Sequence, residues 1–219
     1  MPEGPEVWIL SKAINKFFTD ENKTISYGKH LFQNNEKEDW SFGLTGKVLI
    51  TETSELIKIS SGYVCGSQVI YSELNEVLNK LGLDWMCASK ELLKLEVEKW
   101  KKSKKLLAGL LLDQSKISGI GVAWGSEILQ TAKLSPSLKA CDQDLDLLVD
   151  AMVKVRDDIK EVYSSELERY INALSFVNNW FKNLYDVRNI KVYKMGTKIQ
   201  ILGRSWWVNL EVDQVIIDC

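Results

Sequence analysis

The fold is decided by residues 106–136, which read LLAGLLLDQSKISGIGVAWGSEILQTAKLSP. Two apolar runs flank a turn at Ser118-Gly119-Ile120-Gly121, and the second run stops before Pro136, so the stretch predicts two helices joined by a tight turn. Glycines this close together let the backbone approach a partner without side chains in the way. The N–H groups that start the second helix would face a phosphate. An ordinary helical hairpin also accounts for these residues.

Outward from this motif, a β-rich block comes before it and further helices come after it. Residues 5–18 carry apolar residues at helical spacing and predict an amphipathic helix. From 24 to 72, β-branched runs alternate with glycines, which predicts antiparallel strands. The other predicted helices cover 90–99, 104–113, 123–132, 143–161 and 165–183, and strands return at 190–193, 197–202 and 205–210 with a turn at Gly203-Arg204.

Composition favours a globular intracellular protein. With 219 residues, 45% hydrophobic and 26% charged, the chain can hold one large domain or two small ones. It has no apolar stretch near the ~20 residues that span a bilayer. The N-terminus lacks a basic segment leading into an apolar core, so we expect no secretion and no membrane association. The expected location is the nucleus, or the cytoplasm and nucleoid, depending on the host.

The cysteines and the single histidine do not form a metal-binding pattern. His30 is the only histidine, and the cysteines are scattered over positions 65, 87, 141 and 219. A structural zinc site needs four cysteine or histidine ligands, usually in close pairs. We therefore expect no metal, no cofactor and a reduced location.

Charge is balanced overall but uneven along the chain. The net charge is −2 and the isoelectric point is near 5.6, which counts against a nucleic-acid binder because basic domains are usual there. Basic residues nevertheless gather around Trp100, at Lys99, Lys101, Lys102, Lys104 and Lys105. A local basic stripe can bind phosphates, although a solvated helix edge is the better interpretation of this run taken alone.

The N-terminal residues MPEGPE suggest covalent chemistry. Removal of Met1 turns Pro2 into a secondary amine with a pKa of roughly 7.7–8, so that part of it is uncharged near neutral pH. Such an amine can attack a sugar carbon and form a Schiff base, with Glu3 as the adjacent acid. A proline at the first position of a helix, with Glu6 in its first turn, is equally ordinary helix-start chemistry.

These motifs taken together resemble one family. MPEGPE, followed in order by LLDQ, SGIG, SEIL and LSP, resembles the formamidopyrimidine-DNA glycosylase and endonuclease VIII family. In this resemblance the central motif corresponds to a helix–two-turn–helix, and Gly28-Lys29-His30-Leu31 to the β-turn lysine motif. Residues 42–46 are similar to its glycine-rich intercalation loop, and residues 192–194 and 203–207 to its finger hairpin, in the form without zinc.

The resemblance implies an α+β fold in three parts. A catalytic domain over residues 1–86 would contain a short N-terminal helix and an antiparallel β-sandwich. A helical domain with the helix–two-turn–helix would follow over 87–189, and a zincless-finger β-hairpin with a tail would cover 190–219.

It also implies a bifunctional DNA glycosylase and AP lyase of base excision repair that acts on oxidised bases. Pro2 would attack C1′ of the damaged nucleotide, and β-elimination or β,δ-elimination would follow. The other catalytic residues would be Glu3 as general acid, Glu6 as a brace and Lys29 beside the phosphate. The protein would be a monomer that binds damaged DNA, either duplex or single-stranded. It would contact the DNA through Leu44, Gly119, Ile120, Gly121 and Arg204. Leu44 would be either a wedge inserted between the DNA bases or a leucine buried in a strand.

Two departures from the family pattern favour other functions. Val122 stands where the family usually has an asparagine that binds phosphate, and residues 61–66 replace its usual Arg-Arg-Phe wedge. A catalytically silent relative that binds damaged or abasic DNA is therefore the main alternative. A helical adaptor for a protein partner is a third possibility.

Overall fold

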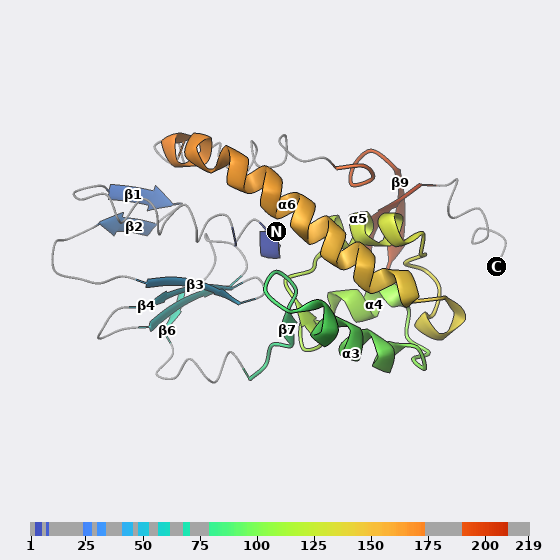
Figure 1. Ribbon diagram of the computed structural model, residues 1–219. Coiled ribbons are helices and arrows are strands. Elements are labelled where there is room, and N and C mark those ends of the chain that lie inside the picture. Colours follow the sequence, from blue (N-terminus) through green and yellow to red (C-terminus); the bar gives the residue numbers. More distant parts are fainter. Residues whose placement is uncertain are drawn as a thin grey trace. The chain divides into compact units, whose positions relative to one another are not determined.

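The computed structural model describes the backbone of residues 3–5, 8, 24–27, 30–33, 41–45, 48–52, 57–61, 68–70, 79–173 and 190–209 (Figure 1). Side chains are described for residues 3–5, 8, 79–165 and 190–209. The chain forms two compact units: Met1–Asn79 with Ile159–Arg188, and Lys80–Asp158 with Asn189–Cys219. The division into a catalytic domain over 1–86, a helical domain over 87–189 and a hairpin with a tail over 190–219 stays a prediction.

Antiparallel strands make up the described part of the first unit between residues 24 and 70. Strands β1 (Thr24–Tyr27) and β2 (His30–Gln33) form one pair. A four-stranded antiparallel sheet follows, in the order β3 (Ser41–Thr45), β4 (Val48–Glu52), β5 (Ile57–Ser61) and β6 (Gln68–Ile70). The antiparallel strands predicted from the β-branched runs are therefore confirmed, whereas the packing of the two sheets as a sandwich stays a prediction.

The predicted loop over residues 42–46 is wrong for most of its length. Residues 41–45 form β3, in which Leu44 lies opposite Leu49 of β4. Only two residues, Gly46 and Lys47, separate Thr45 from its partner Val48. A hairpin this tight takes up the adjoining residues as paired strand, because their N–H and C=O groups find partners at once.

The second unit is mainly helical. Its helices are α3 (Lys90–Trp100), α4 (Leu107–Leu112), α5 (Val122–Ala132) and the first part of α6 (Asp146–Ala173), with a single 3-10 turn, η1 (Ala140–Asp142). Short parallel strands β7 (Leu83–Asp84) and β8 (Ile117–Ser118) pair before α5, and the antiparallel hairpin of β9 (Thr197–Ile201) and β10 (Arg204–Val208) closes the unit.

Helix α6 joins the predicted helix 143–161 to the beginning of the predicted helix 165–183, because it continues through Ser164 and Ser165. The rest of the second predicted helix, 174–183, lies outside the described residues. No glycine or proline interrupts α6. The Ser165 hydroxyl donates to the carbonyl oxygen of Val162 at 2.8 Å, so the serine is satisfied inside the helix. Along the described chain, no helix has both the length and the apolar character needed to cross a membrane.

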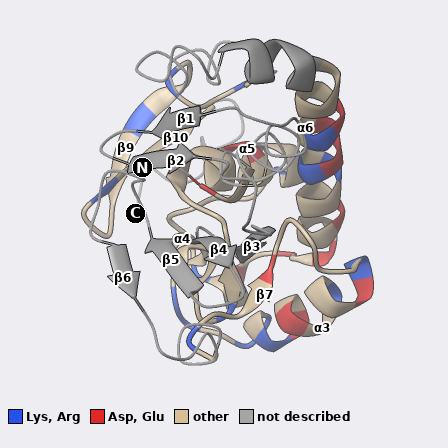
Figure 2. Cartoon of the chain, turned by 90° about the vertical axis from the view of Figure 1, so that its left-hand side faces the viewer, with Lys and Arg blue, Asp and Glu red and all other residues tan. Residues whose placement is uncertain are grey.

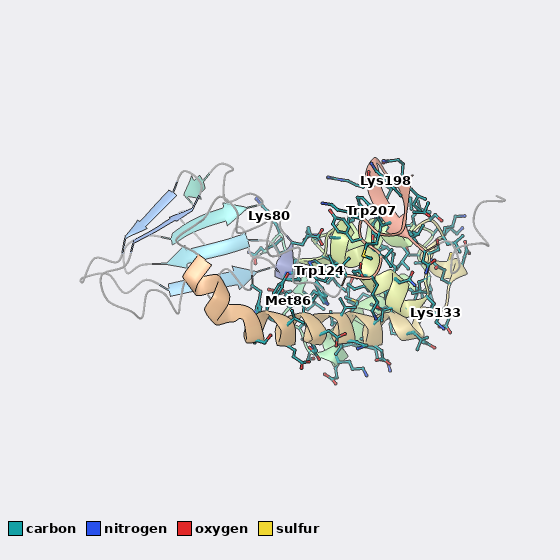
Figure 3. All side chains as sticks on the ribbon, turned by 90° about the horizontal axis from the view of Figure 1, so that it is seen from above. Lys80, Met86, Trp124, Lys133, Lys198 and Trp207 are labelled. Atoms are coloured by element: carbon teal, nitrogen blue, oxygen red, sulfur yellow. The ribbon has the colours of Figure 1, made fainter. Side chains whose placement is uncertain are left out.

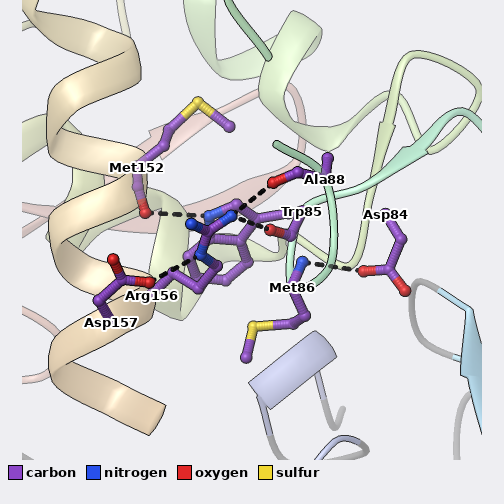
Figure 4. Close-up of polar contacts among 7 residues, drawn as sticks. All are labelled: Asp84, Trp85, Met86, Ala88, Met152, Arg156 and Asp157. Atoms are coloured by element: carbon purple, nitrogen blue, oxygen red, sulfur yellow. Dashed lines mark hydrogen bonds and ion pairs between the residues drawn. The ribbon is translucent and has the colours of Figure 1, made fainter. Parts of the chain in front are cut away.

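Trp85 and Arg156 fasten the start of the second unit to α6 (Figure 4). The fully buried Trp85 indole donates to the Met152 carbonyl at 3.1 Å. In return, Arg156 donates to the carbonyl oxygens of Ala88 at 2.7 Å and Trp85 at 3.4 Å. The two Arg156 bonds supply donors to backbone carbonyl groups that precede α3, and the Trp85 bond gives a buried indole N–H its acceptor on α6.

We expect Arg156→Met to lower the free energy of unfolding by about 1–3 kcal/mol, because two carbonyl groups lose a charged donor. The matched control is Lys154→Met, which breaks an exposed ion pair with Asp158 on the same helix and should change stability by less than ~0.5 kcal/mol. Urea unfolding of both variants measures the difference. Equal effects of the two substitutions would show that Arg156 has no such fastening role.

Candidate functional site

The turn before α5 has a conformation that only glycine adopts without strain at one position. Gly119 has a φ of 95°, outside the regions open to residues with a Cβ. Gln114 fixes the turn from inside: its Oε1 accepts the Gly119 N–H at 2.9 Å, and its Nε2 donates to the Ile120 carbonyl at 2.9 Å. The predicted tight turn is confirmed. Gln114, the last residue of the LLDQ motif, positions this turn, a role that the sequence alone did not indicate.

Helix α5 begins directly after this turn, with Gly121 as its N-cap and no side-chain hydrogen bond at the cap. Gly119, Ile120 and Gly121 are all buried, and Ile120 is fully inaccessible, so only backbone groups of the turn can serve a ligand. Val122, the first helical residue, is half-buried and offers only hydrocarbon. The prediction that these residues contact DNA is not tested by this geometry.

The terminal hairpin turns through Leu202 and Gly203, which have φ angles of 53° and 70°. Two consecutive positive φ angles match the tight turn whose twist suits antiparallel strands. Arg204 is the first residue of β10, opposite Ile201, and is exposed. The sequence predicted Arg204 within the turn, and the structure places it immediately after.

This hairpin packs on α5 through Trp206, which is fully buried. Gly125 permits the approach, since a Cβ at that position would lie 3.1 Å from two carbons of the Trp206 ring. The Ser126 hydroxyl accepts the Trp207 N–H at 3.3 Å. The residues of the SEIL motif and the glycine before it therefore form the surface that receives the hairpin.

Glu127 anchors the segment that leads into the hairpin. Its side chain is buried, with 5% exposure. Oε1 accepts the N–H groups of Val192 at 2.8 Å and Tyr193 at 2.7 Å, and Oε2 accepts the N–H of Lys191 at 2.9 Å. Three backbone donors on one carboxylate compensate for its removal from water.

The same contacts explain why a predicted strand is absent. Residues 190–193 were expected to be extended, but this segment turns, and its N–H groups bind Glu127 instead of a neighbouring strand. Sequence reasoning missed Glu127, because its partners lie more than 60 positions further along the chain.

The hairpin and the segment before it carry basic side chains without acidic ones. Residues 190–209 contain Lys191, Lys194, Lys198 and Arg204 and no acidic residue. Figure 2 shows Lys and Arg in blue on this hairpin, whereas α3 and α6 carry both signs of charge. The hairpin is thus a local basic element in a chain of net charge −2.

The lysine run at 99–105 is partly neutralised. Lys99 pairs with Glu96 at 2.6 Å, and Lys101 pairs with Glu98 at 2.8 Å and with Asp146 at 2.6 Å. Hydrogen bonding to Lys101 lowers the pKa of Asp146. This arrangement favours the interpretation of the run as a solvated helix edge. In the described ranges, no three or more His, Cys, Asp or Glu residues are grouped to hold a metal ion.

Solved structures with the same fold are formamidopyrimidine-DNA glycosylases. The Lactococcus lactis enzyme non-covalently bound to DNA with an AP site superposes with a TM-score of 0.63 and 17% identity, over 96% of this chain and 98% of that chain. Its complex with oxidised-pyrimidine DNA gives a TM-score of 0.60 and 18% identity, over 96% and 99%. An inhibited form of that enzyme with N7-benzyl-Fapy-dG DNA gives a TM-score of 0.60 and 19% identity, over the same shares.

This chain has the formamidopyrimidine-DNA glycosylase fold. Neither a protein-family model nor a curated protein matches its sequence. The sequence identity to these solved structures is below 20%, although the structural similarity covers nearly the whole chain.

At the N-terminal end of this glycosylase fold, Glu3, Gly4 and Pro5 are buried, and Glu3 keeps 6% exposure. The Lys160 ammonium lies 5.8 Å from the centre of the Trp8 ring, which places this segment beside α6 within the first unit. Pro2, Glu6 and Lys29 lie outside the described residues. Gly28 and Lys29 connect β1 to β2, whose last pair is Tyr27 and His30.

Proposed function

We propose that this protein is a bifunctional DNA glycosylase and AP lyase that removes oxidised bases through an imine on Pro2. One observation carries the proposal: a chain that begins Met-Pro-Glu-Gly-Pro-Glu shares its fold, over 96% of its length, with glycosylases crystallised on damaged DNA. The buried Glu3 supports it, since glutamate is rarely buried unless polar contacts or chemistry require it.

In the proposed reaction, the Pro2 nitrogen bonds to C1′ of the damaged nucleotide as the base leaves with the glycosidic electron pair. The bonded nitrogen loses its proton to solvent, Glu3 gives a proton to O4′ as the C1′–O4′ bond opens, and the nitrogen lone pair forms a cationic imine with C1′. Loss of a proton from C2′ then expels the 3′ phosphate and nicks the strand. Glu6 would brace this site and Lys29 would assist the elimination. We propose that the protein acts as a monomer on damaged DNA in the nucleus, or in the cytoplasm and nucleoid, depending on the host.

DNA binding in this proposal uses the turn before α5 and the hairpin. The Gly119 N–H is already bound by Gln114, so the phosphate would be bound by backbone N–H groups at the start of α5, next to the Gly119-Ile120-Gly121 turn. Arg204 would bind another, since its guanidinium suits the geometry of phosphate oxygens and it makes no ion pair with any residue in the described ranges. Leu44, the last residue but one of strand β3, would enter the DNA duplex from the end of that strand where the damaged nucleotide leaves, a step that costs a few kcal/mol of unstacking.

Val122 favours a second candidate, a catalytically silent relative that binds abasic or damaged DNA. Its side chain cannot donate to phosphate, and one charge-assisted contact is worth about 1.5–3 kcal/mol. Weaker binding of the DNA strand lowers the occupancy of the damaged nucleotide in the site. This candidate keeps the fold and the basic hairpin without the covalent step.

Borohydride reduction separates the candidates. Protein with a free Pro2 is incubated with duplex DNA that contains an abasic site or thymine glycol, and sodium borohydride is added. We expect a covalent protein–DNA adduct, with the N-terminal peptide carrying the sugar by mass spectrometry. Salt-sensitive binding without an adduct selects the silent relative, and absence of salt-sensitive binding removes both in favour of the adaptor.

A further inference from the structure

The hairpin has a second, outward face that the proposed function leaves unused. Along β10, Trp206 and Val208 point to α5 and are buried, whereas Trp207 lies on the opposite side of the strand and is half-buried. Lys198 is directly across from Trp207 in the β9–β10 register and is exposed. Figure 3 shows these two side chains together on the hairpin.

Two residues from the segment before β9 extend this face. The ring of Tyr193 packs edge-on against Trp207, with centres 4.6 Å apart, and the Lys194 ammonium lies 5.5 Å from the centre of the Tyr193 ring. We call Tyr193, Lys194, Lys198 and Trp207 the outer hairpin face. Glu127 holds the backbone of Tyr193, the residue whose ring contacts Trp207.

We propose that the outer hairpin face binds unpaired nucleotides of DNA, as a surface separate from the Arg204 contact. Aromatic side chains accept unstacked bases, and nearby lysines bind the phosphates between them. Bases within a duplex are covered by their neighbours, so the aromatic contribution selects single strands. Only the choice of DNA as the polymer depends on the proposed function.

Charge and position support a nucleic-acid ligand over a protein. Residues 190–209 contain no acidic side chain, so no like charge on this segment opposes phosphate. Along β10, Arg204 shares the side of Trp206, whereas Trp207 and Lys198 belong to the opposite side. A strand bound on the outer face would therefore not displace a phosphate bound by Arg204.

A labelled oligothymidylate tests the proposal by fluorescence polarisation across a salt series with the full-length protein. Lys198→Ala removes one phosphate contact and should lower the slope of log affinity against log salt by about 0.7. Trp207→Val keeps a strand-forming residue and removes the ring, so we expect about tenfold weaker binding. The matched control is Lys133→Ala, an exposed lysine that Figure 3 shows apart from the outer hairpin face.

Thermal unfolding of each variant checks that it is folded, and Lys198→Ala, an exposed position, decides the question if Trp207→Val is not. Oligothymidylate binding equal to wild type in both variants would overturn the proposal, as would no binding by the wild type, the result expected of a protein-binding face. Borohydride trapping is run on the same samples. Trapping without the outer-face effects rejects this inference alone, and outer-face binding without trapping rejects only the lyase.

Discussion

Protein in which Pro2 carries a preceding residue is expected to give no borohydride-trapped adduct with abasic DNA. An amide nitrogen has no available electron pair for attack on C1′, so the covalent route is closed. We expect the adduct yield to fall by about a thousandfold or more, equivalent to ~4 kcal/mol of lost transition-state stabilisation. The comparison is between a cleavable N-terminal tag left in place and the same protein after cleavage to expose Pro2.

Binding separates this effect from loss of substrate. Equilibrium affinity for abasic duplex should be similar before and after cleavage, since the phosphate contacts proposed for the turn before α5 and for Arg204 would not involve the amine. A tagged protein that traps as well as the cleaved protein would refute the assignment of Pro2. A lysine would then be the nucleophile, and peptide mapping of the adduct would identify it.

Glu127→Ala is expected to have the largest effect on stability. The substitution leaves the N–H groups of Lys191, Val192 and Tyr193 without their acceptor and opens a space beneath the hairpin. Hydrogen bonds to a charged group are worth about 1.5–3 kcal/mol each, and part of this is recovered when water enters, so we expect a loss of about 3–5 kcal/mol. For a chain of this size, ~3 kcal/mol or more corresponds to a fall in Tm of about 6–12 °C.

Calorimetry with two further variants tests the cause. Glu127→Gln keeps one acceptor oxygen and places an NH2 group beside an N–H donor, so it should lose about half as much as Glu127→Ala. Glu161→Ala on exposed α6 surface is the matched carboxylate control, with an expected change below ~0.5 kcal/mol. A wild-type Tm for Glu127→Ala would show that other acceptors serve these three N–H groups.

Glu127 also explains how a hairpin without metal ligands keeps its place. Trp206 of the hairpin is buried against Gly125. The Glu127 carboxylate accepts three backbone N–H groups from the segment just before the first strand. Both contacts come from residues two positions apart in α5, the helix that follows the glycine turn. The glycine turn and the basic hairpin are therefore both attached to α5, and a substitution in α5 should affect both.

Local sequence determined the elements whose stability is local. Helix 123–132 was predicted from its apolar spacing and its glycine start and is found at Val122–Ala132. The strands around residues 48–52 and 57–61 followed from β-branched runs, and the closing hairpin followed from Gly203 between two such runs. In each case the residues that set φ and the residues that bury the apolar face lie within one turn or one strand.

Tertiary structure alone decided the features that join distant residues. The turn at 190–193 depends on a carboxylate more than 60 positions earlier, and the seating of Trp206 depends on the missing side chain of Gly125. Local pattern also gave two wrong predictions. It placed a helix break before Ser165, where α6 is continuous, and a loop over residues 42–46, where residues 41–45 form a paired strand. Local propensities are worth tenths of a kcal/mol per residue, whereas burial and hydrogen bonding supplied by another element are worth several times more, so the distant partner prevails.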